Sequence, residues 1–253
     1  MTHTKPSHLL YFQGVEGIPI KTVYEDLKEG MINLFQDLND HMKQRWCPDN
    51  HNHSYHEGDL RRLKREQVQF NVRTNDRCMV IGKERESVGE LMNQLATVEI
   101  MFCVLDEFMN KFPRIMVEEC HPTTSSQEQG TPEGPARPRD KGHDLILRQR
   151  GGVSDVLHCV EISDVMGTGN NNKKIDKDLE TLANSHQMHA EGGPHHFYLA
   201  CSPESQKHLY RSKGWKKEFA ARIDDPHTNS SKTCFLNEVP CDILQKIQES
   251  KKT

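Results

Sequence analysis

Long apolar runs are missing from this sequence. No segment approaches the roughly 18 consecutive apolar residues that a membrane-spanning helix needs, so we expect no membrane partner. The first residues also lack an apolar stretch followed by a small-residue cleavage site, which predicts a chain without a secretory signal. Residues 10–14 (LYFQG) resemble a protease-recognition remnant. We therefore treat residues 1–14 as a tail or cloning remnant and leave them out of the fold prediction.

A disulfide framework and an excess of positive charge are missing too. The eight cysteines show no regular spacing, which predicts reduced thiols in an intracellular protein. Three of them lie inside apolar runs and are predicted to be small core residues: Cys103, Cys159 and Cys201. The formal net charge of -4 excludes a generally basic nucleic-acid coat. Any contact with nucleic acid must therefore be local, through basic patches or bound metal.

Two long amphipathic helices are predicted in the N-terminal half. Residues 21–44 carry apolar residues at helical spacing, interrupted by Gly30, which predicts one helix or a bent pair. A second apolar stripe predicts a helix over residues 87–111, with Ser87 as its N-cap and Pro113 just beyond its end. Residues 15–86 are thus predicted to form a helical part that packs on a core over residues 87–202.

Extended segments follow the second helix. Residues 114–119 predict a short strand, and residues 121–142 predict a flexible loop because they are rich in Pro, Gly, Ser and Thr. Two strands are predicted over residues 143–148 and 156–165, and the turn signal Gly151-Gly152 indicates that they form a hairpin. A helix ending near residue 189, a strand over 196–201 and a C-terminal helical part over 203–253 complete the chain. The order helix, strand, strand, strand, helix, strand predicts an α/β core.

Two carboxylates lie on the predicted hairpin. Asp144 is at the start of its first strand, and Glu161 lies within the second, on the same face as Cys159 and Ser163. Hairpin pairing would bring Asp144 and Glu161 together near one end. A carboxylate in an otherwise apolar strand is costly to bury unless metal or hydrogen bonds satisfy it. Converging carboxylates bind the Mn2+ or Mg2+ ions that assist phosphodiester hydrolysis, so we predict a site for one or two such ions.

The hairpin motif resembles a known nuclease motif. Asp144 followed by Glu161-Ile162-Ser163, in this order of helices and strands, resembles the PD-(D/E)XK nuclease superfamily over roughly residues 87–201. His143 replaces the usual Pro, and Ser163 stands where most members carry a lysine. The resemblance implies a mixed central sheet flanked by helices, with additional N-terminal helices. It also implies that Asp144 and Glu161 bind the metal and that the carbonyl of Ile162 adds a ligand.

One branch of the superfamily moves the lysine onto the next helix. This branch is the cap-snatching endonuclease domain of segmented negative-strand RNA virus polymerases, either the influenza-like polymerase acidic subunit or the arenavirus-like L protein. The lysine lies about a dozen residues beyond the glutamate there, and Lys174 is at that distance from Glu161. Helical geometry places Lys174 on the flank of the predicted buried stripe, whereas Lys173 and Lys177 point nearly opposite. Lys174 is therefore the predicted catalytic lysine.

The same branch takes a further ligand from a helix before the sheet. Residues 97–102 resemble that helix in influenza-like subunits, which implies Glu99 as a metal ligand beside Asp144 and Glu161. The influenza-like histidine falls at Thr97, so the resemblance implies a weaker site or the acidic ligand set of arenavirus-like domains. Glu118 and Glu119 remain alternatives for a middle acidic ligand.

These features predict a metal-dependent endonuclease in which Lys174 orients the attacking water and stabilises charge at phosphorus. The viral resemblance implies RNA rather than DNA as the substrate, other polymerase subunits as partners, and a location in the host nucleus or cytoplasm. Two alternatives stay open. One is a restriction-type DNA endonuclease with the same core. The other is a degenerate nuclease fold that serves as a structural or interaction module of a polymerase, which Thr97 and Ser163 suggest.

Other polar clusters carry weaker signals. The candidates for phosphate contacts are Arg61, Arg62, Lys64, Arg65, Lys213, Lys216 and Lys217, although a solvated surface also explains them. A second cluster has the side chains of zinc ligands, namely Cys47, His51, His53 and His56. Its spacing matches no standard finger, so we do not predict zinc. Residues 167–173 precede a helix but lack the Gly-Lys-Ser/Thr signature of a phosphate-binding loop.

Overall fold

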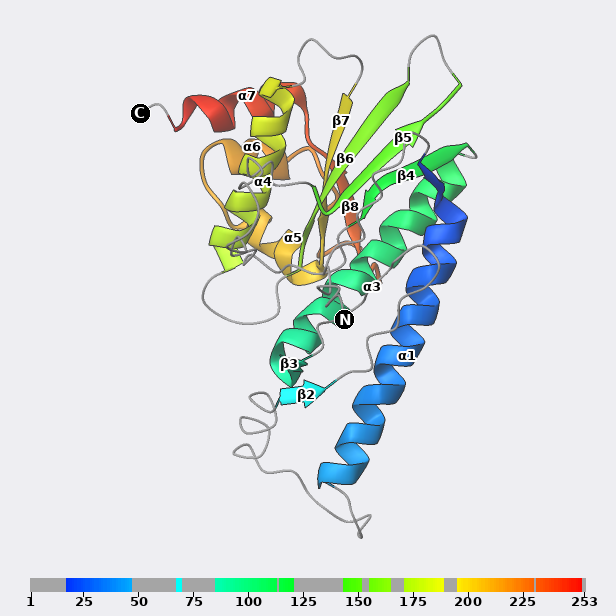
Figure 1. Cartoon of the computed structure of the whole chain (residues 1–253). Helices are drawn as coiled ribbons and strands as arrows, with labels where there is room; N and C mark the ends of the chain where they lie inside the picture. The colour runs from blue at the N-terminus through cyan, green and yellow to red at the C-terminus, as the bar shows by residue number, and fades with distance from the viewer. Residues whose placement is uncertain are drawn as a thin grey trace, which may run out of the picture.

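A mixed β-sheet forms the centre of the molecule. The computed structural model describes residues 17–46, 67–69, 85–112, 114–120, 143–151, 155–164, 171–188, 195–229 and 231–251. Within these residues a six-stranded sheet has the order β1-β4-β5-β6-β7-β8 (Figure 1). Helices cover both of its faces (Figure 1). The predicted α/β class with a mixed sheet flanked by helices is confirmed.

The predicted order of helices and strands is also confirmed. The elements are α3 (Val88–Lys111), β4 (Ile115–Cys120), β5 (Leu145–Gln149), β6 (Val156–Ser163), α4 (Asn171–Met188) and β7 (His195–Cys201). Strands β4, β5 and β6 pair antiparallel, and β6 pairs parallel with β7. The β5–β6 pair is the predicted hairpin. Gly151 follows β5 with a φ of 117°, a left-handed conformation that glycine adopts without steric cost.

The N-terminal part contributes one long helix and a short strand. Helix α1 (Ile20–Trp46) is a single element, which decides between the predicted helix and the bent pair. Strand β1 (Ile18–Pro19) pairs antiparallel with β4 and extends the sheet at that edge, which the sequence did not predict. Strands β2 (Gln67–Gln69) and β3 (Arg85–Ser87) form a separate small sheet, and Ser87 lies directly before α3.

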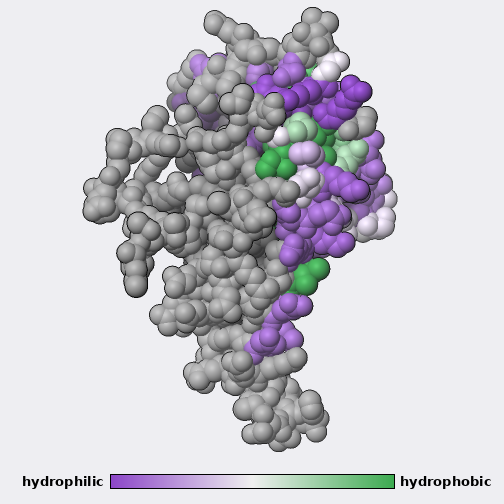
Figure 2. Space-filling view, turned by 45° about the vertical axis from the view of Figure 1, so that its right-hand side comes forward, coloured by the Kyte–Doolittle hydropathy of each residue, from purple (hydrophilic) through white to green (hydrophobic). Residues whose placement is uncertain are grey.

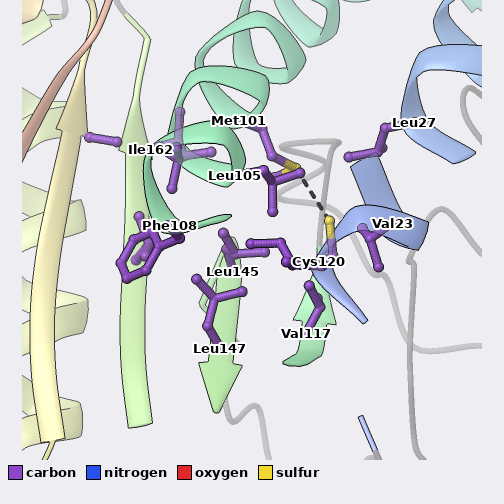
Figure 3. Close-up of a cluster of buried hydrophobic side chains, with 14 of the residues drawn as sticks. Val23, Leu27, Met101, Leu105, Phe108, Val117, Cys120, Leu145, Leu147 and Ile162 are labelled. Carbon is purple, nitrogen blue, oxygen red and sulfur yellow. Dashed lines mark hydrogen bonds between the residues drawn. The ribbon is translucent and has the colours of Figure 1, made fainter. Parts of the chain in front are cut away.

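Helices α1 and α3 cover one face of the sheet. Their apolar stripes meet the inward side chains of β4, β5 and β6, and Figure 3 shows this core: Val23, Leu27, Met101, Leu105, Phe108, Val117, Cys120, Leu145, Leu147 and Ile162. The Cys120 thiol contacts the Met101 sulfur at 3.3 Å (Figure 3). Each fully buried side chain of this size contributes roughly 1.5–3 kcal/mol, so this layer holds the hairpin rigidly in place.

The opposite face is covered by α4 and the C-terminal helices α5 (Pro203–Tyr210), α6 (Trp215–Ala220) and α7 (Cys241–Glu249). The predicted inner face of α4 is confirmed, because Ile175, Leu179 and Leu182 are all buried. Cys159 and Cys201 are buried as predicted. Cys103 is only partly buried, so its prediction as a core residue was wrong.

The C-terminal part is not purely helical as predicted. Residues 235–238 form strand β8 (Phe235–Glu238), which pairs antiparallel with β7 and extends the sheet at its far edge. Four residues are too few to show the alternation that identifies a strand. The strand forms through its pairing with β7 and through the burial of Phe235 and Asn237.

The described surface is mainly hydrophilic. Figure 2 shows the side of the molecule that carries α1 and β4, where purple residues predominate over a few green ones. Ile32 on α1, 50% exposed, is the large hydrophobic side chain that stands out to solvent among the described residues. No helix in the described parts of the chain is both long and apolar enough to cross a membrane.

Candidate functional site

Asp144 and Glu161 meet at one end of the β5–β6 hairpin. Asp144 directly precedes β5, and Leu145 pairs with Val160 of β6, so Asp144 lies beside Glu161 in the register. The Asp144 carboxylate accepts a hydrogen bond from the Ile162 backbone N–H at 2.7 Å. The hairpin thus brings together the two carboxylates that the sequence singled out.

Glu161 is buried and hydrogen-bonded. Its side chain is 8% exposed, and its Oε1 lies 2.8 Å from Nδ1 of His143. The other ring nitrogen of His143, Nε2, lies 2.9 Å from the Ser185 hydroxyl on α4. A Ser-His-acid series also occurs in serine hydrolases, where the serine must meet a substrate. Ser185 is buried, only 5% exposed, so this series serves to hold Glu161 rather than to supply a nucleophile.

Lys174 enters the same cluster from the start of α4. Its ammonium donates to the carbonyl of Ile162 at 2.9 Å and forms an ion pair with Asp164. Burial acts to lower the pKa of Lys174, but the carboxylates of Asp164, Asp178 and Asp144 outweigh it and raise the pKa above its ordinary value. Lys174 therefore stays protonated and supplies positive charge to the cluster.

Asp164 and Thr97 belong to the cluster, although the sequence analysis did not select them. The Thr97 hydroxyl donates to Asp164 Oδ2 at 2.6 Å, and Lys174 pairs with the other oxygen. Helix α3 thus reaches the cluster through Thr97, which is fully buried.

Glu99 is not brought to this cluster. Two residues advance a helix by about 200°, so Glu99 points nearly opposite Thr97, and its side chain is exposed. The predicted placement of Glu99 beside Asp144 and Glu161 is therefore wrong. The resemblance of residues 97–102 implied Glu99 as a ligand, whereas the packing of α3 turns Thr97 inward instead.

Asp178 is a further carboxylate that the sequence analysis missed. It lies one helical turn after Lys174, is 7% exposed, and its Oδ2 has no hydrogen-bond partner within the described residues. Burial raises its pKa well above the ordinary value, Lys174 opposes this, and the charges of Glu161 and Asp144 add to it. The nearby Ser163 hydroxyl also lowers the pKa, although no hydrogen bond of ordinary geometry joins the two groups. The spacing of four residues from Lys174 is the signal that could have found Asp178.

The cluster is rich in carboxylates and poor in cations. The acidic residues around Lys174 are Asp144, Glu161, Asp164 and Asp178. Oxygen ligands of this kind suit Mg2+ or Mn2+, and the unpartnered Asp178 oxygen marks where positive charge is short. The donor chemistry therefore fits a divalent cation.

The present orientations differ from a finished metal site. Among the residues that the structure describes, no group of three or more His, Cys, Asp or Glu side chains converges as a metal-binding set. Glu161 is turned to His143, Asp144 accepts from a backbone N–H, and the carbonyl of Ile162, predicted as a ligand, accepts from Lys174. Binding an ion at the Ile162 carbonyl would require Lys174 to leave that oxygen, whereas the His143 contact of Glu161 uses one carboxylate oxygen, Oε1.

Glu118 is engaged by an arginine. It forms a two-pronged ion pair with Arg148 of β5, in which Arg148 Nη2 lies 3.0 Å from Glu118 Oε2. This hydrogen bonding raises the pKa of Arg148. The β4–β5 register shifts between Val117 and Glu119, so the backbone of Glu119 pairs with Ile146, two residues from Asp144. The Glu118 carboxylate is thus already engaged, and the side chain of Glu119 lies outside the described residues.

The predicted basic residues divide into two groups. Lys213 and Lys217 are exposed near α6, whereas Lys216 pairs with Asp176 and lies 5.5 Å from the ring centre of Trp215. Trp215 is partly buried against the hydrophobic core between the sheet and the helices α4 to α7, so this core covers one side of its ring. The other group, Arg61, Arg62, Lys64 and Arg65, lies outside the described residues, as do Cys47, His51, His53, His56 and most of residues 167–173.

Comparison with known proteins identifies no relative. No protein-family model, no curated protein and no solved structure matches the chain.

Proposed function

We propose that this chain is a divalent-metal-dependent endonuclease with a PD-(D/E)XK-type core. The observation that carries the proposal is the convergence of Asp144, Glu161 and Lys174 at one end of the β5–β6 hairpin. The connectivity supports it as well, because α3, β4, β5, β6, α4 and β7 follow the order expected for that core, with three antiparallel strands and one parallel.

Asp144, Glu161 and Asp178 are the side chains proposed to bind the ion. A bound Mn2+ or Mg2+ would supply the positive charge that activates water and neutralises the departing oxygen. The hairpin fixes Asp144 and Glu161, and α4 brings Asp178 against them from the opposite side. Without an ion, burial and the charges of Glu161 and Asp144 raise the pKa of Asp178 well above its ordinary value.

Lys174 is proposed to act on the substrate. Its positive charge is secured by Asp164, Asp178 and Asp144, and its bond to the Ile162 carbonyl sets its position beside β6. A fixed ammonium at this place can donate to an oxygen on which charge develops during attack at phosphorus. This role needs no movement of α4.

RNA is the proposed substrate class. The catalytic lysine lies on the helix after the glutamate strand, which is the arrangement of the cap-snatching branch of the superfamily. Basic residues near α6, Lys213 and Lys217, are exposed and available for phosphate contacts. Cleavage of single-stranded RNA in preference to duplex DNA follows from this proposal.

The test is cleavage of end-labelled single-stranded RNA and of duplex DNA with the same sequence, in Mn2+, Mg2+ or EDTA. The variants are Asp144→Asn and Glu161→Gln, with Asp106→Asn as the matched control because Asp106 is an exposed carboxylate on α3. We expect RNA cleavage in Mn2+ or Mg2+ by the wild type and the control only. Cleavage restricted to DNA would support a restriction-type enzyme, and cleavage that persists in both site variants would contradict the proposed site.

A second candidate function is a nuclease-like fold that binds without cutting. One observation favours it: Thr97, at the position of the metal-binding histidine in the influenza-like members of the viral branch, donates to Asp164. This candidate predicts that the wild type binds neither Mn2+ nor Mg2+ and leaves RNA intact. Titration of the folded protein with Mn2+ separates the two functions before any substrate is added.

A further inference from the structure

A buried series of hydrogen bonds holds Glu161. His143 lies 2.8 Å from Glu161 and 2.9 Å from Ser185, and all three residues are buried, with 4–6% of each residue exposed. The series joins the segment before β5, the middle of the sheet and the last part of α4. We infer that His143 is a positioning residue that fixes the carboxylate of Glu161 for metal binding. This inference rests on the proposed function.

The chemistry of the partners sets the direction of both bonds. An ionised carboxylate can only accept, so Nδ1 of His143 carries the proton and donates to Glu161. In the neutral ring Nε2 then accepts, and the Ser185 hydroxyl donates to it. Ser185 thereby selects the tautomer that Glu161 requires. The side chain of Glu161 has three rotatable bonds. The His143 ring holds it in one orientation, and Ser185 holds that ring through its other nitrogen.

His143 also takes the position where the PD-(D/E)XK motif usually has a proline. A proline restricts the backbone before the aspartate but offers no donor. His143 offers a donor to the neighbouring strand instead, across the hairpin from its own segment. The orientation of Glu161 therefore depends on a side chain in this protein. Partners that orient metal ligands typically change metal affinity by about 10- to 100-fold when they are removed.

The test measures Mn2+ affinity by calorimetric titration of the wild type, His143→Phe, Ser185→Ala and Glu161→Gln. The matched control is His196→Phe, because His196 also places Nδ1 2.7 Å from a glutamate, Glu238, but at an exposed position. We expect His143→Phe to weaken binding by about 10- to 100-fold, Ser185→Ala to weaken it less, and the control to bind as the wild type. In the Glu161→Gln background, His143→Phe should cause no further loss, because its effect passes through Glu161.

Two results would overturn the inference: an unchanged affinity of His143→Phe, or losses that add fully in the double variant. If His143→Phe does not fold, Ser185→Ala carries the test, since it keeps the ring, and an unchanged affinity of that variant overturns the inference. If the wild type binds no Mn2+, the proposed function fails instead. Nitrogen-15 spectra of the histidine rings then decide the positioning separately: an Nδ1–H signal of His143 that shifts in Glu161→Gln supports it, and the Nε2–H tautomer contradicts it.

Discussion

Asp178 follows Lys174 by one turn of α4, and the charge of each side chain shifts the pKa of the other. The pKa of the lysine is raised by its acidic neighbours, and the pKa of the aspartate is raised by burial and by Glu161 and Asp144. One helix thus contributes both a fixed cation and a carboxylate whose Oδ2 has no hydrogen-bond partner among the described residues.

Asp178→Asn should stabilise the protein and weaken its metal site. Since the pKa of Asp178 is raised in the folded state, this carboxyl ionises more easily in the unfolded chain, and its ionisation near pH 7 favours unfolding. We expect the amide to raise the free energy of unfolding by about 1–2 kcal/mol in EDTA. The same variant should bind Mn2+ at least tenfold more weakly, roughly the scale of a lost metal partner. Urea unfolding and Mn2+ titration measure the two effects, and a destabilised variant with normal Mn2+ affinity would contradict this account.

Lys174→Met should abolish most cleavage without removing the metal site. Methionine keeps the length of the side chain but offers no donor and no charge. We expect kcat to fall by roughly 100-fold or more, the cost of losing one donor to a developing charge. Mn2+ affinity should be retained or rise, because Asp164 and Asp178 lose their competing cation. A variant that cleaves at the wild-type rate rules out the proposed role of Lys174.

Glu119→Gln and Glu118→Gln should behave differently. Glu118 is paired with Arg148, so its amide variant should lose about 1 kcal/mol of stability or less and keep its Mn2+ affinity. The backbone of Glu119 pairs with Ile146, which is two residues from Asp144 in the sequence. The amide variant of Glu119 should weaken Mn2+ binding tenfold or more. Parallel titrations of the two variants test this, and the reverse order of effects would assign the ligand to Glu118.

His158 should make the protein sensitive to acid. Burial, and then the neighbouring His196, lower the pKa of His158 to about 4 from 6.5. Both nitrogens of the His158 ring are buried without hydrogen-bond partners among the described residues, so the folded protein favours the neutral ring. The unfolded chain binds a proton at higher pH than the folded chain. The stability of the folded protein should therefore fall as pH decreases from about 6.5 to about 4, and His158 should account for up to about 3 kcal/mol of this loss.

The check is urea unfolding of the wild type and of His158→Phe at several pH values. Phenylalanine suits the site, since His158 packs against Phe108, Phe112 and Tyr198. The variant should lose most of this pH dependence, while the loss should persist in His196→Phe. An equal acid sensitivity of wild type and His158→Phe would show that another group is responsible.

The sequence predicted the elements better than the partners of their side chains. Local apolar periodicity was enough for α1, α3 and α4, and Gly151 was enough for the hairpin. Strands β1 and β8 were missed because so few residues form them, and distant pairing with β4 and β7 stabilises them.

The candidate site shows the same division. Asp144 and Glu161 were found because carboxylates stood out beside apolar strands. The contact between Thr97 and Asp164 joins residues 67 positions apart, and no local pattern encodes it. Glu99 was misplaced because the resemblance over residues 97–102 did not fix which side of α3 faces the sheet. Asp178 was within reach of sequence analysis, since it lies four residues from Lys174 on the same helix.

The most direct test of the central claim is thermal unfolding of the wild type, Asp144→Ala, Glu161→Ala and the control Asp106→Ala in EDTA, Mg2+ and Mn2+. An ion that binds only the folded state raises its stability by mass action. We expect Mn2+ or Mg2+ to raise the melting temperature of the wild type and of Asp106→Ala. Neither ion should raise the melting temperature of the two site variants. Equal melting temperatures of the wild type in EDTA and in both ions would contradict the proposed metal site.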